Sequence, residues 1–271
     1  MLYIIGTPIG NLSDLSKRAV DTLSSVDVVF AEDTRTALNL LNSLNIKKPC
    51  KSYYKDNEKQ ASKSLMECLL NGDNVALISE AGMPCISDPG TYIMQEVIKN
   101  NIKYEIIQGP TALIHGLIAS GFSGSSFYFH GFLPHKKSDK EKEIQKLIKI
   151  NAPIIFYESP YRVKETVLML LEYFPAPIAV IREATKMYEE TVFVTNQEEV
   201  ENITIKGEFV IVANNAVEQE DDTNNIDINY NKIIAELLSD NVSSKDILKM
   251  MKALGLKRNE AYELINQLQN K

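Results

Sequence analysis

The chain has 271 residues, of which 44% are hydrophobic and 24% are charged, and its net charge is −7. This composition predicts a globular protein long enough for two domains, and the acidic balance argues against a generally basic nucleic-acid-binding protein. Apolar runs stay far below the roughly 18 residues of a membrane helix, so we expect a cytoplasmic protein with no membrane partner. Three cysteines without C-x-x-C spacing predict neither disulfides nor a metal site.

Short apolar runs alternate with helical patterns in the first part of the chain, which predicts an α/β domain over residues 1–120. The predicted strands are Leu2–Ile5, Val26–Ala31, Val75–Ser79 and Lys103–Ile107, with a weaker one at Ser52–Tyr54. The predicted helices are Leu15–Leu23, Thr36–Leu44, Glu58–Leu70, Ile93–Asn100 and Ala112–Ala119. The runs are continuously apolar, as parallel strands covered on both faces should be.

Four of these strands end in distinctive loops, namely GTPIGNLSD, EDTRT, EAGMPCISDPG and QGPTA. Ligands of open α/β sheets bind beyond the carboxyl ends of the strands, so these loops should converge on one pocket. The loops lack the G-x-G-x-x-G and Walker A motifs, which disfavours a nicotinamide cofactor or a nucleoside triphosphate. Prolines and glycines without lysines suit a ligand held by backbone groups and apolar walls, such as a nucleoside carrying an amino-acid tail.

A glycine- and serine-rich stretch, SGFSGSS at Ser120–Ser126, separates this part from a second predicted α/β domain over residues 121–217. Its strand patterns are FYFHGF, PIIFYE, PIAVIRE, TVFVT and GEFVIVA, and its helices are predicted at Lys140–Ile150 and Val163–Phe174. The acidic stretch Glu218–Asn225 is typical of a linker. The third segment, residues 226–271, is predicted to form a small helical unit resembling a helix-turn-helix, with helices at Tyr230–Leu238, Lys245–Leu254 and Arg258–Leu268.

Two lysine-rich stretches, His135–Lys149 and Lys245–Lys271, run against the acidic average of the chain. Each could face phosphates, or could be the solvated face of an amphipathic helix. The sequence leaves both readings open.

The motifs TPIGNL, AEDTR, SEAGMPCISDPG, GPTA, FYESPYR and GEFVIV occur in the order and spacing of one family. The chain closely resembles the bacterial small-subunit ribosomal RNA ribose 2′-O-methyltransferases, which modify a cytidine of the decoding region and have the tetrapyrrole (corrin/porphyrin) methylase fold. The similarity covers roughly Leu2–Asn214. It implies two α/β domains with the cofactor cleft between them, S-adenosylmethionine as methyl donor, 16S ribosomal RNA of the small ribosomal subunit as substrate, and a homodimer.

The resemblance also implies which residues lie against the donor. These are Pro8, Ile9, Gly82, Met83, Pro84, Ile86, Thr111, Ala112, Tyr157 and Glu158. The residues ISDPG, which end the loop EAGMPCISDPG, are expected to brace that loop. Cys85 stands where the family usually has glycine, and at a positive φ its side chain would cost roughly 1 kcal/mol or more of strain. Either the backbone at Cys85 is conventional, or the loop has shifted slightly.

Candidates for removing the hydroxyl proton are Glu32, Asp33 and Arg35 of AEDTR, at the end of a predicted buried strand. A carboxylate could accept the proton, while Arg35 could hold an RNA phosphate or orient that carboxylate. Equally, Asp33 could cap the following helix and pair with Arg35. Glu183 and Lys186 of IREATK are a second pair of lower rank.

Two other functions remain open from the sequence. One is methylation of a tetrapyrrole precursor by an enzyme of the same fold, and the other is a non-catalytic RNA-binding protein on that scaffold. The AGMPCISDP loop differs from the G-x-G-D-P loop usual in tetrapyrrole enzymes, and the third helical segment is not needed for them. Both features favour RNA as the substrate.

Overall fold

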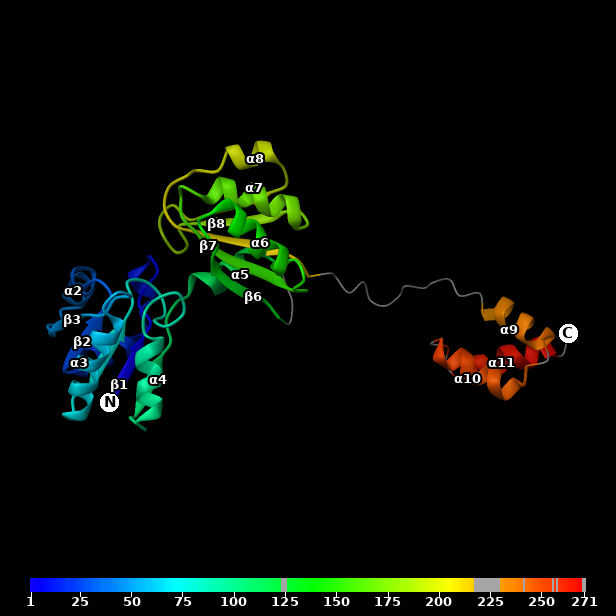
Figure 1. The fold of residues 1–271 in the computed structure, drawn as a ribbon, viewed down its shortest axis with the longest axis horizontal. Coiled ribbons are helices and arrows are strands. Elements are labelled where there is room, and N and C mark those ends of the chain that lie inside the picture. The colour runs from blue at the N-terminus through cyan, green and yellow to red at the C-terminus, as the bar shows by residue number, and fades with distance from the viewer. Residues whose placement is uncertain (123–125, 217–229, 241, 255, 257, 270–271) are drawn as a thin grey trace. The chain divides into compact units, whose positions relative to one another are not determined.

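The computed structural model describes residues 1–122, 126–216, 230–240, 242–254, 256 and 258–269. The chain forms two compact units, Met1–Val217 and Glu218–Lys271 (Figure 1). The predicted linker Glu218–Asn225 lies outside the described residues. The first unit holds two five-stranded sheets, one in each half, as the sequence predicts for its two α/β domains.

The first sheet is parallel and has the strand order β3-β2-β4-β1-β5. Its strands are β1 (Leu2–Ile5), β2 (Val28–Ala31), β3 (Cys50–Ser52), β4 (Val75–Ile78) and β5 (Tyr104–Ile107). A 3-10 turn, η1 (Leu12–Asp14), follows β1. Ile5 and Ala31 both pair with Ile78 in register, so the carboxyl ends of three central strands are level at one edge.

Helices cover both faces of this sheet. One face packs against α1 (Lys17–Ser25) and α2 (Thr34–Ser43), and the other against α3 (Glu58–Leu70) and α4 (Thr91–Lys99). Side chains alternate along the central strand β4: Val75 and Leu77 belong to one core, and Ala76 and Ile78 to the other. Both faces are therefore buried, which explains the unbroken apolar run of this strand in the sequence.

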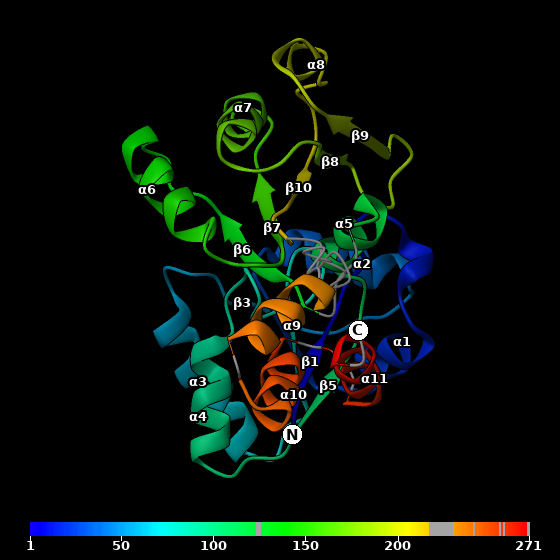
Figure 2. The same cartoon turned by 90° about the vertical axis from the view of Figure 1, so that its right-hand side faces the viewer.

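The second sheet is mixed and has the order β6-β7-β10-β8-β9. Its strands are β6 (Tyr128–Phe132), β7 (Pro153–Glu158), β8 (Ile178–Arg182), β9 (Glu190–Val194) and β10 (Phe209–Asn214). Strands β6 and β7 are parallel, and all other neighbours are antiparallel. One face packs against α6 (Lys137–Leu147), α7 (Val163–Tyr173) and α8 (Gln197–Glu201), and the other against α5 (Ala112–Ser120) (Figure 2).

Helix α8, which has only five residues, was not predicted from the sequence. Its signal is the Asn-x-x-Glu spacing of a capping box. The side chain of the N-cap Asn196 accepts a hydrogen bond from Glu199 N, and the Glu199 carboxylate accepts one from the N–H of Thr195, the residue before the cap. The other predicted helices and strands of the first unit are present, with ends displaced by up to three residues.

The second unit contains α9 (Tyr230–Ser239), α10 (Ser244–Ala253) and α11 (Arg258–Gln269), as predicted. They enclose a small apolar core made of Ile234, Ile247, Met251, Ala261 and Ile265. Among the described residues, no helix is long and apolar enough to cross a membrane.

Candidate active site

The loops after β1, β4 and β5 meet at the level edge of the first sheet, as the sequence predicts. Thr7 and Gly82 exchange backbone hydrogen bonds of 2.9 and 3.1 Å, which joins the first loop to the third. Gly6 lies against Gly109 so closely that a Cβ on Gly6 would be 2.6 Å from the Gly109 Cα. Only residues without a side chain allow these two loops to cross at this distance.

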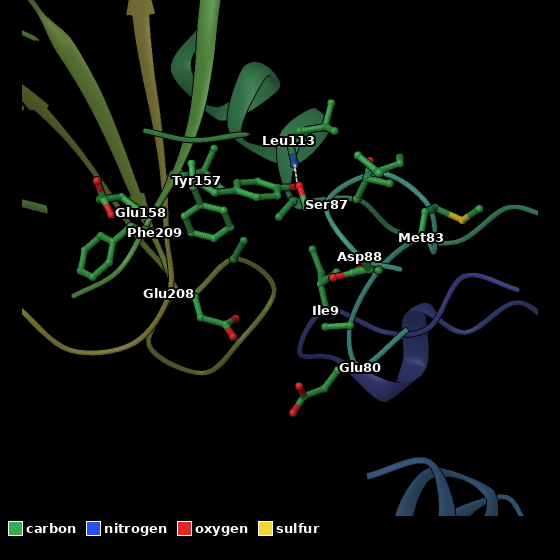
Figure 3. A pocket seen from close by; sticks show the side chains of 18 of the residues that line it. Ile9, Glu80, Met83, Ser87, Asp88, Leu113, Tyr157, Glu158, Glu208 and Phe209 are labelled. Carbon is green, nitrogen blue, oxygen red and sulfur yellow. Dashed lines mark hydrogen bonds between the residues drawn. The ribbon is translucent and has the colours of Figure 1, made fainter. Parts of the chain in front are cut away.

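A cavity of about 300 Å³ opens at this junction and is lined from both halves of the first unit. This volume is at the lower end of the range of small-molecule sites. Figure 3 shows Glu80, Ser87 and Asp88 on one side and Tyr157, Glu208 and Phe209 on the other. The lining consists of Ile9, Glu32, Glu80, Ala81, Gly82, Met83, Ile86, Ser87, Asp88, Thr111, Ala112, Leu113, Phe132, Tyr157, Glu158, Ala184, Glu208, Phe209 and Val210.

Most residues that the resemblance assigns to the donor line this cavity. They are Ile9, Gly82, Met83, Ile86, Thr111, Ala112, Tyr157 and Glu158. Pro8 and Pro84 do not line it, and each is the immediate neighbour of a residue that does. The two prolines therefore affect the cavity through the backbone conformation of their loops and not through contact of their own side chains.

Tyr157 holds the start of α5 at the cavity wall. Its hydroxyl accepts a hydrogen bond of 3.1 Å from the backbone N–H of Leu113, in the first turn of α5 (Figure 3). The ring packs edge-on against Phe129 and Phe132 at centroid distances of 4.9 and 5.7 Å. Burial raises the pKa of Tyr157 to about 12, so the phenol stays neutral.

In the loop EAGMPCISDPG after β4, Cys85 has a left-handed backbone conformation, with φ 71°. The conventional backbone considered for this position is therefore not present, and the side chain is strained by about 1–2 kcal/mol. Cys85 packs against Gly90, since a Cβ on Gly90 would be 2.6 Å from the Cys85 Sγ. Gly90 itself has φ 136°, a conformation that other residues adopt rarely. The ISDPG half contributes to the cavity through Ser87 and Asp88 and braces the loop through Gly90.

Glu58 on α3 holds this loop from outside the cavity. Gly90 is the N-cap of α4 and has no side chain to cap the helix. The Glu58 Oε1 accepts hydrogen bonds from Gly90 N (2.9 Å) and Tyr92 N (3.4 Å) instead. The same oxygen accepts a hydrogen bond of 3.3 Å from the Tyr53 hydroxyl. Glu58 thus supplies from α3 the negative charge that the start of α4 favours.

Replacing Glu58 by alanine should lower the free energy of unfolding by about 1–2 kcal/mol, the usual value of a helix cap. Affinity for a ligand in the cavity should fall as well, because the loop that carries Gly82 and Asp88 loses its brace. Glu58→Gln keeps an oxygen acceptor and should lose less. Thermal unfolding and ligand calorimetry measure both effects. Glu67→Ala, at an exposed position of the same helix, is the matched control, and an equal effect there would contradict this role.

Three carboxylates, Glu32, Glu80 and Asp88, lie together in the cavity lining. Glu32 follows β2 and Glu80 follows β4, the neighbouring strand. The pKa of Glu32 is raised by burial and by the negative charges of Asp88 and Glu80. Burial also raises the pKa of Asp88, and Glu80 adds to this effect. A carboxylate with a raised pKa is a better proton acceptor than an ordinary one.

Asp33 and Arg35 do not line the cavity. Asp33 caps α2: its Oδ1 accepts a hydrogen bond of 2.7 Å from Arg35 N, and its Oδ2 one of 2.7 Å from the Arg35 guanidinium. These bonds lower the pKa of Asp33 to about 2. The Arg35 side chain is 88% exposed. The structure thus has the capping arrangement for these two residues, and among the three AEDTR candidates Glu32 alone borders the cavity.

Glu183 and Lys186 form an ion pair of 2.9 Å beside the cavity, and Lys186 Nζ also donates to the carboxylate of Glu208 at 2.9 Å. Glu208 lines the cavity, whereas Glu183 and Lys186 do not. His115 lies outside the lining too and contacts Glu189 at 3.2 Å. The sequence analysis gave Glu208 no role, because the motif GEFVIV that contains it was interpreted only as a strand.

Comparison with known proteins identifies the family to which this fold belongs. A family model described as "Tetrapyrrole (Corrin/Porphyrin) Methylases" matches residues 1–201. The structure of diphthine synthase aligns with a TM-score of 0.64 at 15% identity, covering 79% of this chain and 90% of that one. Uroporphyrin-III C-methyltransferase from Thermus thermophilus, in complex with S-adenosylhomocysteine, aligns with a TM-score of 0.56 at 16% identity, covering 80% and 98%. The fold is therefore that of the tetrapyrrole methylases.

Curated relatives identify a narrower family than the fold does. Ribosomal RNA small subunit methyltransferase I of Bacillus subtilis is 41% identical over 226 residues, which is 82% of this chain and 77% of the relative. The protein of that name from Thermotoga maritima is 43% identical, over 70% of this chain and 85% of the relative. The one from Mesorhizobium japonicum is 34% identical over 99% of this chain and 92% of the relative, so the similarity extends through the helical unit. The chain belongs to the ribosomal RNA small subunit methyltransferase I family.

Proposed function

We propose that the chain is an S-adenosylmethionine-dependent methyltransferase that modifies the ribose 2′-hydroxyl of a cytidine in the decoding region of 16S ribosomal RNA. The observation that carries the proposal is the cavity between the two halves of the first unit, lined by residues of the family motifs. Curated relatives that are 41% and 43% identical to this chain are named ribosomal RNA small subunit methyltransferase I. The homodimer that the resemblance implies stays a prediction.

The residues present fit S-adenosylmethionine. This donor carries an adenosine, an amino-acid tail and a positively charged sulfonium. Ile9, Met83 and Val210 supply apolar wall, and Glu32, Glu80 and Asp88 supply negative charge that suits a cation. The start of α5, at Thr111 and Ala112, borders the cavity and has no side-chain cap, so its partial positive charge suits a carboxylate. Each part of the donor therefore has a wall of matching chemistry.

The donor would supply a methyl group whose bond to sulfur breaks, with the electron pair left on sulfur, as the ribose oxygen bonds to the methyl carbon. Glu32 takes the proton of the 2′-hydroxyl, because it borders the cavity and its pKa is raised by burial and by the neighbouring acids. Tyr157 and the loop that carries Gly82 keep the cavity walls in place. Such positioning by itself can lower a barrier by roughly 7–11 kcal/mol.

The test is to incubate the chain with labelled S-adenosylmethionine and either small ribosomal subunits from a strain lacking the modification or a porphyrinogen. Label in the RNA of the subunits is the expected result. Label in the porphyrinogen alone would identify a tetrapyrrole methyltransferase instead. Calorimetry that detects no donor binding, together with no label in either acceptor, would identify a non-catalytic RNA-binding protein.

A further inference from the structure

Two exposed aromatic side chains stand at the edge of the second sheet where β6 and β7 end. Phe132 is the last residue of β6 and is 57% exposed, and Tyr161, in the turn after β7, is 94% exposed. The two strands are parallel and pair Phe132 with Tyr157, so both end at the same edge. Arg162 joins the two segments, since its guanidinium donates a hydrogen bond of 2.8 Å to the carbonyl of Leu133.

Phe132 connects this edge to the proposed active site. It lines the cavity, and its ring packs edge-on against the ring of Tyr157 with an interplanar angle of 65°. Tyr157 is itself anchored by its hydrogen bond to Leu113. The Phe132 ring is therefore supported from one side while most of its surface is open. A supported, open aromatic ring is what proteins present to unpaired nucleobases, because every base has a face that stacks.

Unpaired positive charge follows directly in the chain. Lys136 and Lys137 are exposed, and neither forms an ion pair with any residue that the structure describes. Lys142 and Lys149 of this stretch are also exposed and form no ion pair with a residue that the structure describes, whereas Lys140 is fully buried and bonds to Glu165 and Thr166, and Lys146 pairs with Glu143. The stretch His135–Lys149 thus contains both paired and unpaired lysines, and among the unpaired ones Lys136 and Lys137 are nearest to Phe132 in the chain.

The charge of the cavity opposes that of this edge. Glu32, Glu80 and Asp88 make the cavity lining acidic, which disfavours a phosphate inside it. Lys136 and Lys137, which follow Phe132 closely in the chain and do not line the cavity, offer phosphates a favourable place outside it. An RNA strand can therefore turn one ribose toward the cavity while its backbone remains at the edge.

We propose that Phe132, Tyr161, Lys136 and Lys137 form a docking surface for the single-stranded RNA segment that carries the target ribose. Phe132 stacks on the base of the target nucleotide, Tyr161 stacks on a neighbouring base, and the two lysines neutralise phosphates. This inference rests on the proposed function and adds to it which surface of the chain binds the substrate.

The experiment compares Phe132→Leu and Tyr161→Ala with the unchanged chain, using small ribosomal subunits as substrate. Loss of one stacked base should raise the KM for the subunit, or the Kd of a single-stranded cytidine-containing oligonucleotide measured by anisotropy, by about 5- to 150-fold. Phe132→Trp keeps a stacking ring and should retain affinity. Lys136→Gln and Lys137→Gln should each lower the slope of log Kd against log salt by about 0.7.

Two controls make the result specific. Tyr104→Ala removes an aromatic side chain that is 43% exposed at the start of β5, at the opposite end of that strand from the cavity, and should change nothing. Calorimetry with S-adenosylmethionine should give the same affinity for Tyr161→Ala as for the unchanged chain, because Tyr161 does not line the cavity. Unchanged RNA affinity in both Phe132→Leu and Tyr161→Ala, or loss of donor affinity in place of RNA affinity in Tyr161→Ala, would overturn the docking surface. If the unchanged chain fails to methylate the subunits, the proposed function fails, while the oligonucleotide titrations still test the surface.

Discussion

Glu32→Gln is expected to lower the rate of methyl transfer by about 10²- to 10⁴-fold, the usual contribution of a positioned proton acceptor. The amide has nearly the same size as the carboxylate but cannot take the hydroxyl proton. Donor affinity should change little, because Glu80 and Asp88 remain in the cavity. Single-turnover rates at saturating donor measure the effect, and calorimetry measures the affinity. Asp33→Asn is the matched control, since Asp33 caps α2 outside the cavity and should alter the rate far less.

The pH dependence of the rate follows from the same assignment. A proton acceptor works only when it is deprotonated, so the rate should fall as pH drops through the pKa of Glu32. Burial, Asp88 and Glu80 raise that pKa above its ordinary value of 4.5, so the fall should begin at a higher pH than for an ordinary glutamate. Glu80→Gln removes one of the neighbouring charges and should move the fall to lower pH. An unchanged rate profile in Glu32→Gln would contradict the role of Glu32.

Glu158→Ala is expected to lower the free energy of unfolding by about 3–5 kcal/mol, because it leaves the partly buried Arg162 without its ion-pair partner. The Glu158 side chain is 1% exposed, and its oxygens accept hydrogen bonds of 2.8 Å from Ser159 N, 2.8 Å from Arg162 and 2.7 Å from Thr166. Its carboxylate is thus held by the protein while the residue borders the cavity. Chemical unfolding followed by circular dichroism measures the change.

A second ion pair of the same sheet provides the comparison. Arg182 and Glu190 are 3.1 Å apart, but the Glu190 side chain is 46% exposed. Glu190→Ala should therefore cost at most about 1 kcal/mol, as exposed pairs do. A cost for Glu158→Ala as small as for Glu190→Ala would show that the buried network around Arg162 does not stabilise the second sheet.

The first sheet could be predicted from the sequence more fully than the cavity. Parallel strands buried on both faces leave unbroken apolar runs, so β1 and β4 were found almost to the residue. The rule that ligands lie beyond the carboxyl ends of such strands then located the loops that carry Glu32 and Gly82. Motif resemblance added Tyr157 and Glu158, which lie in the other half of the unit.

Glu208 and Phe209 could not be found in this way, and the reason is the antiparallel part of the second sheet. Strand β10 runs opposite to β7 and pairs Phe209 with Glu158, so its amino end, not its carboxyl end, borders the cavity. Strand direction in a mixed sheet depends on pairing between distant segments, which no local pattern encodes. The roles of Asp33 and Glu32 were likewise inseparable in the sequence, because they are adjacent and only the fold places one at the cavity and the other at a helix start.

The position of the transferred methyl group decides whether the chain methylates the ribose 2′-hydroxyl of a cytidine. Small subunits labelled by the chain are digested to nucleosides, and the RNA is also treated with alkali, which cleaves only where a 2′-hydroxyl is free. We expect the label to be recovered as 2′-O-methylcytidine from the decoding region, at one linkage that resists alkali. Label recovered as a base-methylated nucleoside, or spread over many positions, would contradict it.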